Sequence, residues 1–360
     1  MSRFAIIMAG GSGTRFWPES RRRTPKQMLD LLGKGRSLLR STFERTAALV
    51  PAANIYVVTG EAIAPDVRRS IPELGADAVL EEPVGRNTAP CIGWACRRIL
   101  ARDAEALVGV FPSDHTIGSE REFDRIIAAA FDRLEAEDRI MTVGIRPSRP
   151  ETGYGYIEAG PPVAGEVRRV LRFVEKPDAA TAETYVRAGT YFWNGGIFLF
   201  RVRRMIREIE EKLRDTSGAL AKMQAAFERG GNAEERKEAA RLFPAIQGIS
   251  IDYGVMEKAE GVEVIPGDFG WSDLGSWRAI YEASAKDADG NCLRGRGRLV
   301  THRARGVLVS TRSDKVVAVV GLDNLVIVDT DDALLVCPMG MDQHVREIVE
   351  GLKGRGDERT

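Results

Sequence analysis

The sequence predicts an α/β protein: a Rossmann-like, mostly parallel (mixed) sheet with helices on both faces, followed by a small C-terminal β module and a closing helix. Short apolar runs alternate with helical patterns through the first two-thirds of the 360 residues, and this alternation is typical of a parallel sheet. After Ser284 the texture changes, because shorter apolar runs are then separated by polar turns. A large first domain and a small second one are therefore expected.

Apolar runs are the expected strands of the sheet, and amphipathic segments are its expected helices. The strands are Phe4–Met8, Ile55–Val58, Ala78–Leu80, Leu107–Phe111 and Ile140–Ile145. The helices are Ser37–Val50, Ala89–Leu100 and Glu122–Glu135, the last with apolar residues at a period of about 3.6. Ligands of such sheets bind beyond the carboxyl ends of the strands, and both Gly10–Gly13 and Asp114 closely follow a strand.

The later part of the chain is expected to hold a helical stretch and then a β module. A charged segment from Val202 to about Arg241 predicts helix, and the turn-rich Lys286–Asn291 marks a domain boundary. We therefore expect one domain over residues 1–285 and a second over residues 286–360. In the second, apolar runs recur roughly every ten residues, which indicates a short β-helix. The apolar face of its closing helix is made of Val345, Ile348, Val349 and Leu352.

Composition limits the classes of partner. The chain has 52 basic and 52 acidic residues, so nothing indicates nucleic acid, and it lacks the run of about 18 apolar residues that a membrane span needs. Its start shows no signal-peptide pattern, so a cytoplasmic protein is expected. The cysteines, Cys91, Cys96, Cys292 and Cys337, are expected to be buried free thiols. The β module has no cluster of chemically useful groups, so its expected role is structural or oligomeric, a homodimer included.

The segment Ala9–Lys26, AGGSGTRFWPESRRRTPK, predicts a polyphosphate-binding loop. Glycines let a backbone approach a phosphate closely, and the cationic side chains that follow supply charge. A P-loop is excluded because no Lys-Ser or Lys-Thr follows the glycines. A dinucleotide fingerprint is excluded because Phe16 stands where its third glycine should be.

The same loop, with Arg15–Pro18 and Pro25–Gln27, resembles the signature of the sugar-nucleotide pyrophosphorylases, and most of all their mannose-1-phosphate guanylyltransferase branch. Later segments carry the same resemblance in the family's order over roughly the first four-fifths of the chain. They are Phe111–His115, Thr152–Ile157, Phe173–Pro177, Trp193–Phe198 and Trp271–Trp277. One glycine-rich loop is weak evidence, whereas an ordered set of motifs is strong.

The resemblance implies a nucleotidyltransferase domain over residues 1–285 that transfers GMP from GTP to mannose 1-phosphate and yields GDP-mannose and pyrophosphate. It implies that Asp114 and Asp273 hold a catalytic Mg²⁺, a cation that prefers carboxylate and phosphate oxygens. Taken alone, Asp114 would more often be a helix cap or a turn residue, and Asp273 would more often form an Asx-turn before Gly275. By resemblance, Arg15 neutralises the leaving pyrophosphate and Lys26 steadies the α-phosphate.

The resemblance also implies two binding sets. Nucleotide contacts would come from Ala9, Gly10, Gly11, Gly13, Thr14, Asn87 and Thr88. Thr88 is equally well placed to be the N-cap of the following helix. Sugar-phosphate contacts would come from Gly153, Glu175, Lys176 and Asn194.

Other functions remain open. The nearest alternative is the same reaction with another sugar 1-phosphate or nucleotide. Another is a non-catalytic regulatory subunit that senses GDP-mannose, which ranks low because the phosphate and metal residues are all present. Some relatives carry an additional isomerase domain, and the length of this chain and its 3 histidines lead us to expect no isomerase activity.

Overall fold

The structure is a computed structural model that describes residues 1–11 and 13–360, so Ser12 of the glycine-rich loop lies outside the described residues. The chain divides into two compact units, which are described separately below. The first unit comprises Met1–Gly10, Thr42–Ser113 and Ile117–Trp271. The second unit comprises Gly11–Ser41, Asp114–Thr116 and Ser272–Thr360.

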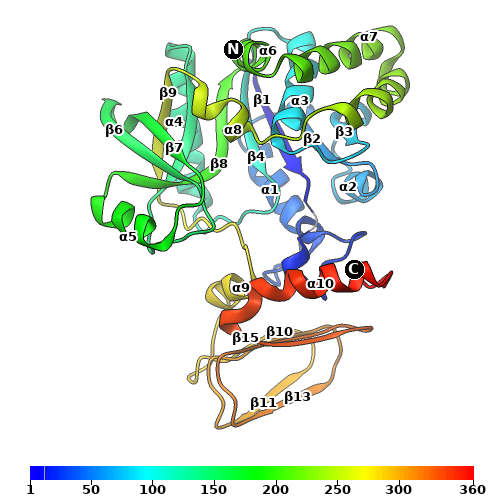
Figure 1. Ribbon diagram of the computed structural model, residues 1–360, viewed down its shortest axis with the longest axis vertical. Coiled ribbons are helices and arrows are strands. Elements are labelled where there is room, and N and C mark those ends of the chain that lie inside the picture. Colours follow the sequence, from blue (N-terminus) through cyan, green and yellow to red (C-terminus); the bar gives the residue numbers. More distant parts are fainter. Residues whose placement is uncertain (12) are drawn as a thin grey trace. The chain divides into compact units, whose positions relative to one another are not determined.

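The first unit is built on a 9-stranded sheet of order β3-β2-β1-β4-β8-β5-β9-β7-β6 (Figure 1). The strands β3, β2, β1 and β4 pair in parallel, whereas β8 runs antiparallel to both β4 and β5. The predicted fold class is confirmed, and the mixed character comes from the second half of the sheet. The strands are β1 (Arg3–Ala9), β2 (Ile55–Gly60), β3 (Val79–Glu82), β4 (Leu107–Pro112), β5 (Ile140–Ile145), β6 (Tyr156–Ala164), β7 (Val167–Val174), β8 (Tyr191–Arg201) and β9 (Val262–Gly267).

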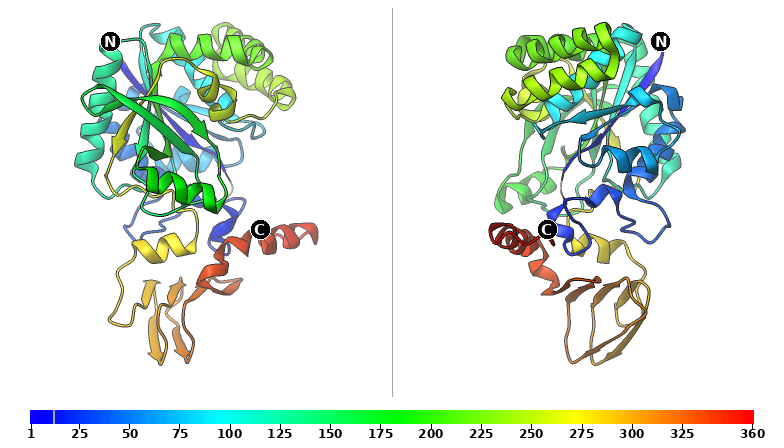
Figure 2. Two further views of the ribbon diagram at one scale, coloured as in Figure 1. Left: turned by 60° about the vertical axis from the view of Figure 1, so that its left-hand side comes forward. Right: turned by 90° about the vertical axis from the view of Figure 1, so that its right-hand side faces the viewer.

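Helices pack on both faces of this sheet (Figure 2). Helix α3 packs on β1 and β2, and α4 packs on β4, β5, β8 and β9. These are opposite faces, because Val108 and Val110 share a core with α3, while a Cβ on the intervening Gly109 would meet Phe131 of α4. The helices are α1 (Leu38–Ala47), α2 (Ala64–Ser70), α3 (Thr88–Arg102), α4 (Glu120–Ala136), α5 (Ala179–Ala188), α6 (Val202–Lys212), α7 (Arg214–Leu242) and α8 (Ile251–Gly254).

Helix α7 is interrupted at Gly230 and Gly231, whose backbone angles are not helical. The predicted charged helical stretch is therefore two helices, α6 and α7, and the second of them is kinked. Among the described residues, no helix combines the length and the apolar character needed to cross a bilayer.

The second unit contains the small β module. Strands β10, β12, β14 and β15 form one sheet, and β11 and β13 form another, with parallel pairing except between β14 and β15. Parallel pairing of strands about eighteen residues apart is the stacking that a β-helix requires. The bounds are β10 (Cys292–Gly295), β11 (Arg298–His302), β12 (Leu308–Thr311), β13 (Val316–Val320), β14 (Leu325–Asp329), β15 (Leu334–Pro338), α9 (Trp277–Ala283) and α10 (Val345–Gly354).

The closing helix α10 differs in one respect from the prediction. Val345 and Val349 are buried, but Ile348 is 54% exposed, so the buried face is narrower than the sequence pattern indicated. Cys337 is likewise only half-buried, whereas the other three cysteines are buried. The apolar cluster beneath α10 also contains Phe16 of the glycine-rich segment.

Candidate active site

The glycine-rich segment leaves β1 at Ala9 and turns sharply. Gly11 and Gly13 have φ angles of 91° and 58°, values that favour glycine. At Gly13 a Cβ would lie 2.4 Å from the Cβ of Lys26 and 3.0 Å from its backbone nitrogen, so a side chain there cannot fit. The carbonyl of Gly13 accepts hydrogen bonds from Ser20 Oγ at 2.7 Å and from the Phe16 amide at 2.9 Å. Gly13 therefore allows the loop to lie directly against Lys26.

Lys26 is the centre of a cluster in the second unit. Its Nζ lies 2.8 Å from Asp114 Oδ2 and also donates a hydrogen bond to the backbone carbonyl of Asp273. The side chain is buried, and its ammonium lies 5.7 Å from the ring centroid of Phe16. The structure thus brings together three residues that are separated by as many as 247 positions in the sequence.

Asp114 is ionised in this setting. Burial alone would raise the pKa of Asp114, but the Lys26 ammonium and the neighbouring His115 outweigh burial and hold that pKa below its usual value. Its side chain keeps 34% exposure, and His115 Nε2 lies 3.8 Å from Asp114 Oδ1. A carboxylate that is charged and still accessible can accept a ligand cation or a metal ion.

Asp273 lies on a constrained turn. Leu274 has a φ of 43°, an uncommon value for a residue with a branched side chain, and a Cβ on Gly275 would lie 2.9 Å from Asp273 Oδ2. The carboxylate therefore folds back over Gly275. Strained backbone of this kind gathers at functional sites. Within the described part of the chain, no group of three or more His, Cys, Asp and Glu side chains forms a metal cage.

Arg15 belongs to the same unit, but the structure does not pair it with the Lys26 cluster. Its Nη1 donates to Gln343 Oε1 at 3.1 Å, and the contact is exposed. Because the Gln343 amide is neutral, it does not compensate the guanidinium charge. Of the other loop cations, Arg21 forms an ion pair with Asp332 at 2.8 Å.

The segment before α3 belongs to the first unit, and here one alternative of the sequence interpretation is decided. The N-cap of α3 is Asn87, whose Oδ1 accepts a hydrogen bond from the Thr88 amide at 2.8 Å. Thr88 is not the cap, because its Oγ1 accepts from the Ile251 amide at 2.8 Å and so ties α8 to α3. Asn87 has a φ of 66°, which asparagine tolerates better than most residues.

Glu82 is a residue of interest that the sequence interpretation missed. It ends β3 at the carboxyl edge of the parallel strands and is only 7% exposed, and its Oε1 has no hydrogen-bond partner among the residues that the structure describes. Burial raises its pKa to about 8. Such an orphan carboxyl oxygen can accept hydrogen bonds from a ligand. The sequence feature that could have indicated Glu82 is an acidic residue at the end of a short, mostly apolar strand.

The expected sugar-phosphate residues also lie in the first unit. Asn194 is held at both ends, because its Nδ2 donates to Asp252 Oδ1 at 2.7 Å and its Oδ1 accepts from the Gly196 amide at 3.1 Å. A Cβ on Gly155 would lie 2.8 Å from Glu175 Oε2 and 3.5 Å from the Cβ of Asn194. Glu175 and Asn194 are therefore neighbours across Gly155, a glycine that the sequence interpretation did not single out.

Lys176 and Gly153 complete this group with less constraint. The Lys176 side chain is 63% exposed, and its backbone φ is 45°. Its Nζ lies 2.9 Å from Glu175 Oε1. The Gly153 amide donates to Glu151 Oε1 at 3.1 Å. Burial raises the pKa of Asp252, although the hydrogen bond from Asn194 opposes this. The group thus offers an exposed cation beside acceptors and donors suited to hydroxyls.

Comparison with known proteins identifies the family of the chain. A family model described as "Nucleotidyl transferase" matches residues 4–290, and another described as "MannoseP isomerase/GMP-like beta-helix domain" matches residues 297–352. The chain therefore belongs to the nucleotidyl transferase family. The second match agrees with the β-helix expected from the spacing of apolar runs.

Individual relatives narrow the class. XanB, a xanthan biosynthesis protein of Xanthomonas campestris pv. campestris (strain ATCC 33913), is 40% identical over 98% of this chain and 73% of its own length. Mannose-1-phosphate guanylyltransferase of Escherichia coli (strain K12) is 37% identical over 98% of this chain and 74% of its own length. Relatives at this identity and coverage confirm the predicted resemblance to the mannose-1-phosphate guanylyltransferase branch.

A solved structure supports the fold over the whole chain. The Thermus thermophilus protein described as a mannose-1-phosphate geranyltransferase has a TM-score of 0.87 at 36% identity. The match covers 98% of this chain and 100% of that one.

Proposed function

We propose that this protein transfers GMP from GTP to mannose 1-phosphate and releases pyrophosphate. The observation that carries the proposal is the convergence of Asp114, Asp273 and Lys26, with Gly13 pressed against Lys26. An anion-binding loop beside two acids and a buried lysine suits a polyphosphate. The relatives named for this reaction support the choice of substrates.

The chemistry is an in-line attack by a phosphate oxygen of the sugar 1-phosphate on the α-phosphorus of GTP. A phosphomonoester is largely dianionic at neutral pH, since its second pKa is about 6, so no general base is needed. The barrier comes from the approach of two anions. Cationic side chains lower it by neutralising charge and by fixing the reacting groups in line.

Two residues fit a Mg²⁺ ion. Asp114 and Asp273 supply carboxylate oxygens, and both already contact one cationic group, the Lys26 ammonium, through the Asp114 carboxylate and the Asp273 carbonyl. When bound, Mg²⁺ would polarise the phosphate oxygens and neutralise their developing charge. One or two carboxylates with phosphate oxygens and water are the usual ligands of this ion.

The remaining residues have binding roles in this proposal. Lys26 steadies the α-phosphate, and Arg15, whose partner Gln343 is neutral, neutralises the pyrophosphate. The nucleotide is held by the glycine-rich loop, through Ala9, Gly10, Gly11, Gly13 and Thr14, and by Asn87 and Thr88 near the base.

The sugar phosphate binds the other group of residues. Lys176 meets its phosphate, while Glu175, Asn194 and Gly153 contact the sugar. Selection among sugars follows because a buried acceptor or donor that finds no hydroxyl partner costs binding energy. We also propose a cytoplasmic location and a homodimer.

The test is a substrate panel on the purified chain. Pyrophosphate release is measured with GTP, ATP, UTP and dTTP, each combined with mannose 1-phosphate or glucose 1-phosphate, in the presence and absence of Mg²⁺. We expect the highest kcat/KM for GTP with mannose 1-phosphate and no turnover after chelation. Faster turnover with another pair would reassign the substrates, and no release with any pair would refute catalysis.

A further inference from the structure

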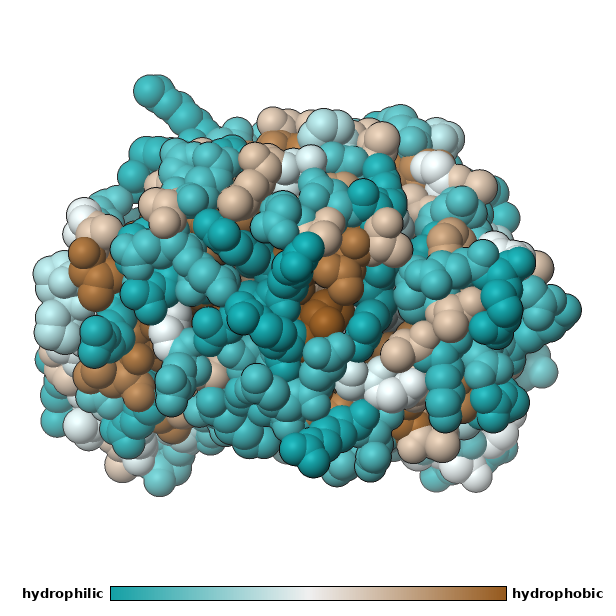
Figure 3. Space-filling model, turned by 90° about the horizontal axis from the view of Figure 1, so that it is seen from above, coloured by the Kyte–Doolittle hydropathy of each residue, from teal (hydrophilic) through white to brown (hydrophobic). Residues whose placement is uncertain are grey.

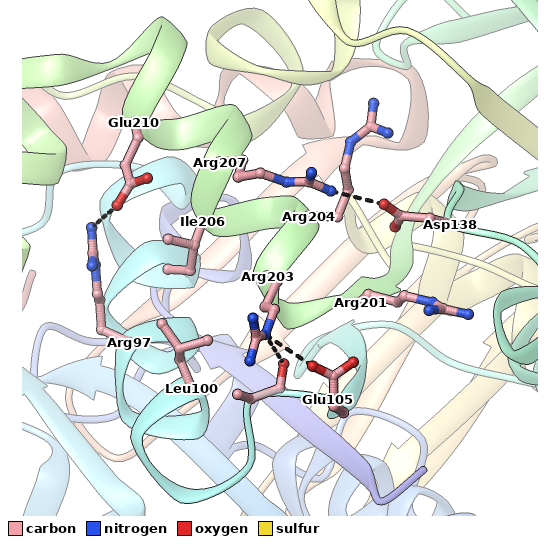
Figure 4. Close-up of a pocket in the computed structure, with 11 residues that line it drawn as sticks. Arg97, Leu100, Glu105, Asp138, Arg201, Arg203, Arg204, Ile206, Arg207 and Glu210 are labelled. Atoms are coloured by element: carbon pink, nitrogen blue, oxygen red, sulfur yellow. Dashed lines mark hydrogen bonds and ion pairs between the residues drawn. The ribbon is translucent and has the colours of Figure 1, made fainter.

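A cavity in the first unit has arginine as the most frequent residue of its lining (Figure 4). Its volume is about 590 Å³, enough for a nucleotide or a sugar phosphate. It lies where β4 and β5 begin and β8 ends, because Arg201 pairs with Leu107 and Phe200 pairs with Ile140. Glu82 and Asn87 lie instead at the edge where the parallel strands end.

The lining has an excess of positive charge. It contains five arginines and three carboxylates, and Arg204 is also paired with Glu208, just outside the lining, at 2.7 Å. One positive charge is therefore left over, in a chain whose formal net charge is zero. The face of the molecule that is seen from above the view of Figure 1 is mostly hydrophilic, with hydrophobic areas between the polar residues (Figure 3). The lining residues are Arg97, Leu100, Ala104, Glu105, Asp138, Arg201, Arg203, Arg204, Ile206, Arg207 and Glu210.

Some of these arginines do not form buried ion pairs. Arg201 donates to the backbone carbonyls of Leu134 and Glu135, which carry no formal charge. Arg203 and Arg207 are 60% and 59% exposed, and their ion pairs with Glu105 and Asp138 lie at the surface. Exposed pairs of this kind contribute only about 0–1 kcal/mol, so these side chains can turn to a better acceptor at little cost.

Helix α6 adds a second indication. Its first turn contains Arg203 and Arg204 and no acidic residue, and its N-cap residue, Arg201, makes no capping hydrogen bond with its side chain. Cations are unfavourable at the positive end of a helix, where anions are stabilised. Arginines at the beginning of a helix are therefore expected where a bound anion offsets their unfavourable interaction with the helix dipole.

We propose that this cavity binds a small phosphorylated ligand, with phosphate oxygens on Arg201, Arg203 and Arg207 and a ring against Leu100 and Ile206. Guanidinium groups hold phosphate through paired, charge-assisted hydrogen bonds, which suits a site built of arginines. Most of the apolar surface for a base or the apolar face of a sugar comes from the half-buried Leu100, since Ile206 is 6% exposed. The ligand belongs to the class of nucleoside polyphosphates and hexose phosphates, and the experiment distinguishes the two. This inference does not depend on the proposed function.

The test measures equilibrium binding by titration calorimetry on the full chain. The probes are ADP, glucose 6-phosphate and inorganic pyrophosphate, and the variants are R203Q/R207Q and the matched control R125Q/R187Q. The control removes two exposed, ion-paired arginines from other helices of the first unit. The variant K26Q separates any binding at the glycine-rich loop.

We expect at least one probe to bind wild type and K26Q with an affinity that R203Q/R207Q weakens about tenfold or more and the control leaves unchanged. Binding should also weaken as salt is raised, because the contacts are ionic. Binding of ADP identifies a nucleotide site and binding of glucose 6-phosphate a hexose phosphate site, whereas pyrophosphate alone identifies recognition of phosphate without a ring. Equal affinities in R203Q/R207Q and wild type, or no binding of any probe to K26Q, would overturn the proposal.

Discussion

At the scale of single residues, the two aspartates of the second unit carry the most specific prediction. Asn keeps the shape of Asp but lacks the charge that a divalent ion requires. We therefore expect Asp114→Asn and Asp273→Asn each to lower kcat about a hundredfold or more. Asp273→Asn should change thermal unfolding little, whereas Asp114→Asn should also lower the unfolding temperature, because it leaves the buried Lys26 ammonium without its ion pair. Steady-state pyrophosphate release and circular dichroism melts measure both effects.

The matched control is Asp332→Asn, which removes an acid that forms a surface ion pair with Arg21 in the same unit. It should keep near wild-type turnover. Near-normal rates in either Asp114→Asn or Asp273→Asn would show that the proposed metal residues are misassigned.

Gly13 is predicted to be irreplaceable for a steric reason. An alanine there would place a Cβ 2.4 Å from the Cβ of Lys26 and would also adopt an unfavourable φ of 58°. Either the loop or Lys26 must move, so Gly13→Ala should lower kcat/KM about tenfold or more, with backbone strain of about 1–3 kcal/mol. Gly340→Ala is the control, since its Cβ would meet nothing within 4 Å. Unchanged kinetics in Gly13→Ala would contradict the close approach of the loop to Lys26.

Glu82 predicts a pH dependence of stability. Its pKa is raised from 4.5 to about 8 by burial, so between these pH values the unfolded chain has lost a proton that the folded chain retains. The free energy of unfolding therefore falls as pH rises through this window, by an amount on the order of a few kcal/mol. Urea unfolding of wild type and Glu82→Gln at pH 5, 6, 7 and 8 measures it.

The glutamine variant stays neutral, so its stability should decline less between pH 5 and pH 8 than that of wild type. Glu61→Gln, an exposed change at the end of β2, should follow the wild-type curve. Identical pH dependence in wild type and Glu82→Gln would show that Glu82 ionises normally in the folded chain.

At the scale of elements, α7 is attached to α3 by a buried ion pair. Arg98 Nη1 lies 2.6 Å from Glu235 Oε2, both side chains are 3% exposed, and Trp94 Nε1 donates to Glu235 Oε1 at 2.8 Å. Removing one partner leaves a buried charge without compensation. Glu235→Ala should therefore lower the free energy of unfolding by about 3–5 kcal/mol, as measured in urea.

Two variants separate the ion pair from its surroundings. Glu238→Ala removes a half-buried acid of the same helix, paired with the exposed Arg241, and should change stability by about 0.5 kcal/mol or less. The double change Arg98→Met with Glu235→Leu should recover much of the loss, because it removes both charges. If Glu235→Ala is as mild as Glu238→Ala, the pair does not hold α7 in place.

At the scale of the whole molecule, the sequence predicted the parallel half of the sheet and the β-helix better than the antiparallel half. Strands such as β4 are buried on both faces and give continuous apolar runs, whereas β7 has a single fully buried residue, Val167, and contains three arginines. Periodicity cannot identify such a strand, because its pairing with β6 and β9 is decided by tertiary contacts.

The same distinction applies to the candidate sites. Lys26, Asp114 and Asp273 could be named from motifs, but their contacts join distant segments that only the fold brings together. Thr88 was the cap that the sequence suggested for α3, but Asn87 is the cap, and Thr88 instead accepts a hydrogen bond from the distant Ile251. Glu82 belongs to no recognisable motif, and its unpaired oxygen could not be predicted because it depends on how β3 is buried in the fold. The proposed site roles and the boundary between residues 285 and 286 remain predictions.

The contacts within the second unit indicate that a chain truncated between residues 285 and 286 would not fold as the full chain does. Its apolar cluster joins Phe16 and Leu31 from the beginning of the chain to Leu308, Val326 and Val349 from the β-helix. Arg294 adds hydrogen bonds to the Leu31 carbonyl at 2.7 Å and to Glu19 at 2.5 Å. Separating these segments would expose apolar surface and release the segment that carries Lys26.

A chain that ends at Ala285 should consequently lose nucleotidyl transfer and aggregate or unfold at a lower temperature than the full chain. Val320→Ala in the full chain is the control, because it changes an exposed residue of the β-helix. Gel filtration, thermal melts and pyrophosphate release measure the three properties together. A soluble 1–285 fragment with full turnover would show that the β-helix is dispensable for the Lys26 cluster. The contacts of the β-helix with Phe16, Glu19 and Leu31 would then not be needed to hold the segment that carries Lys26.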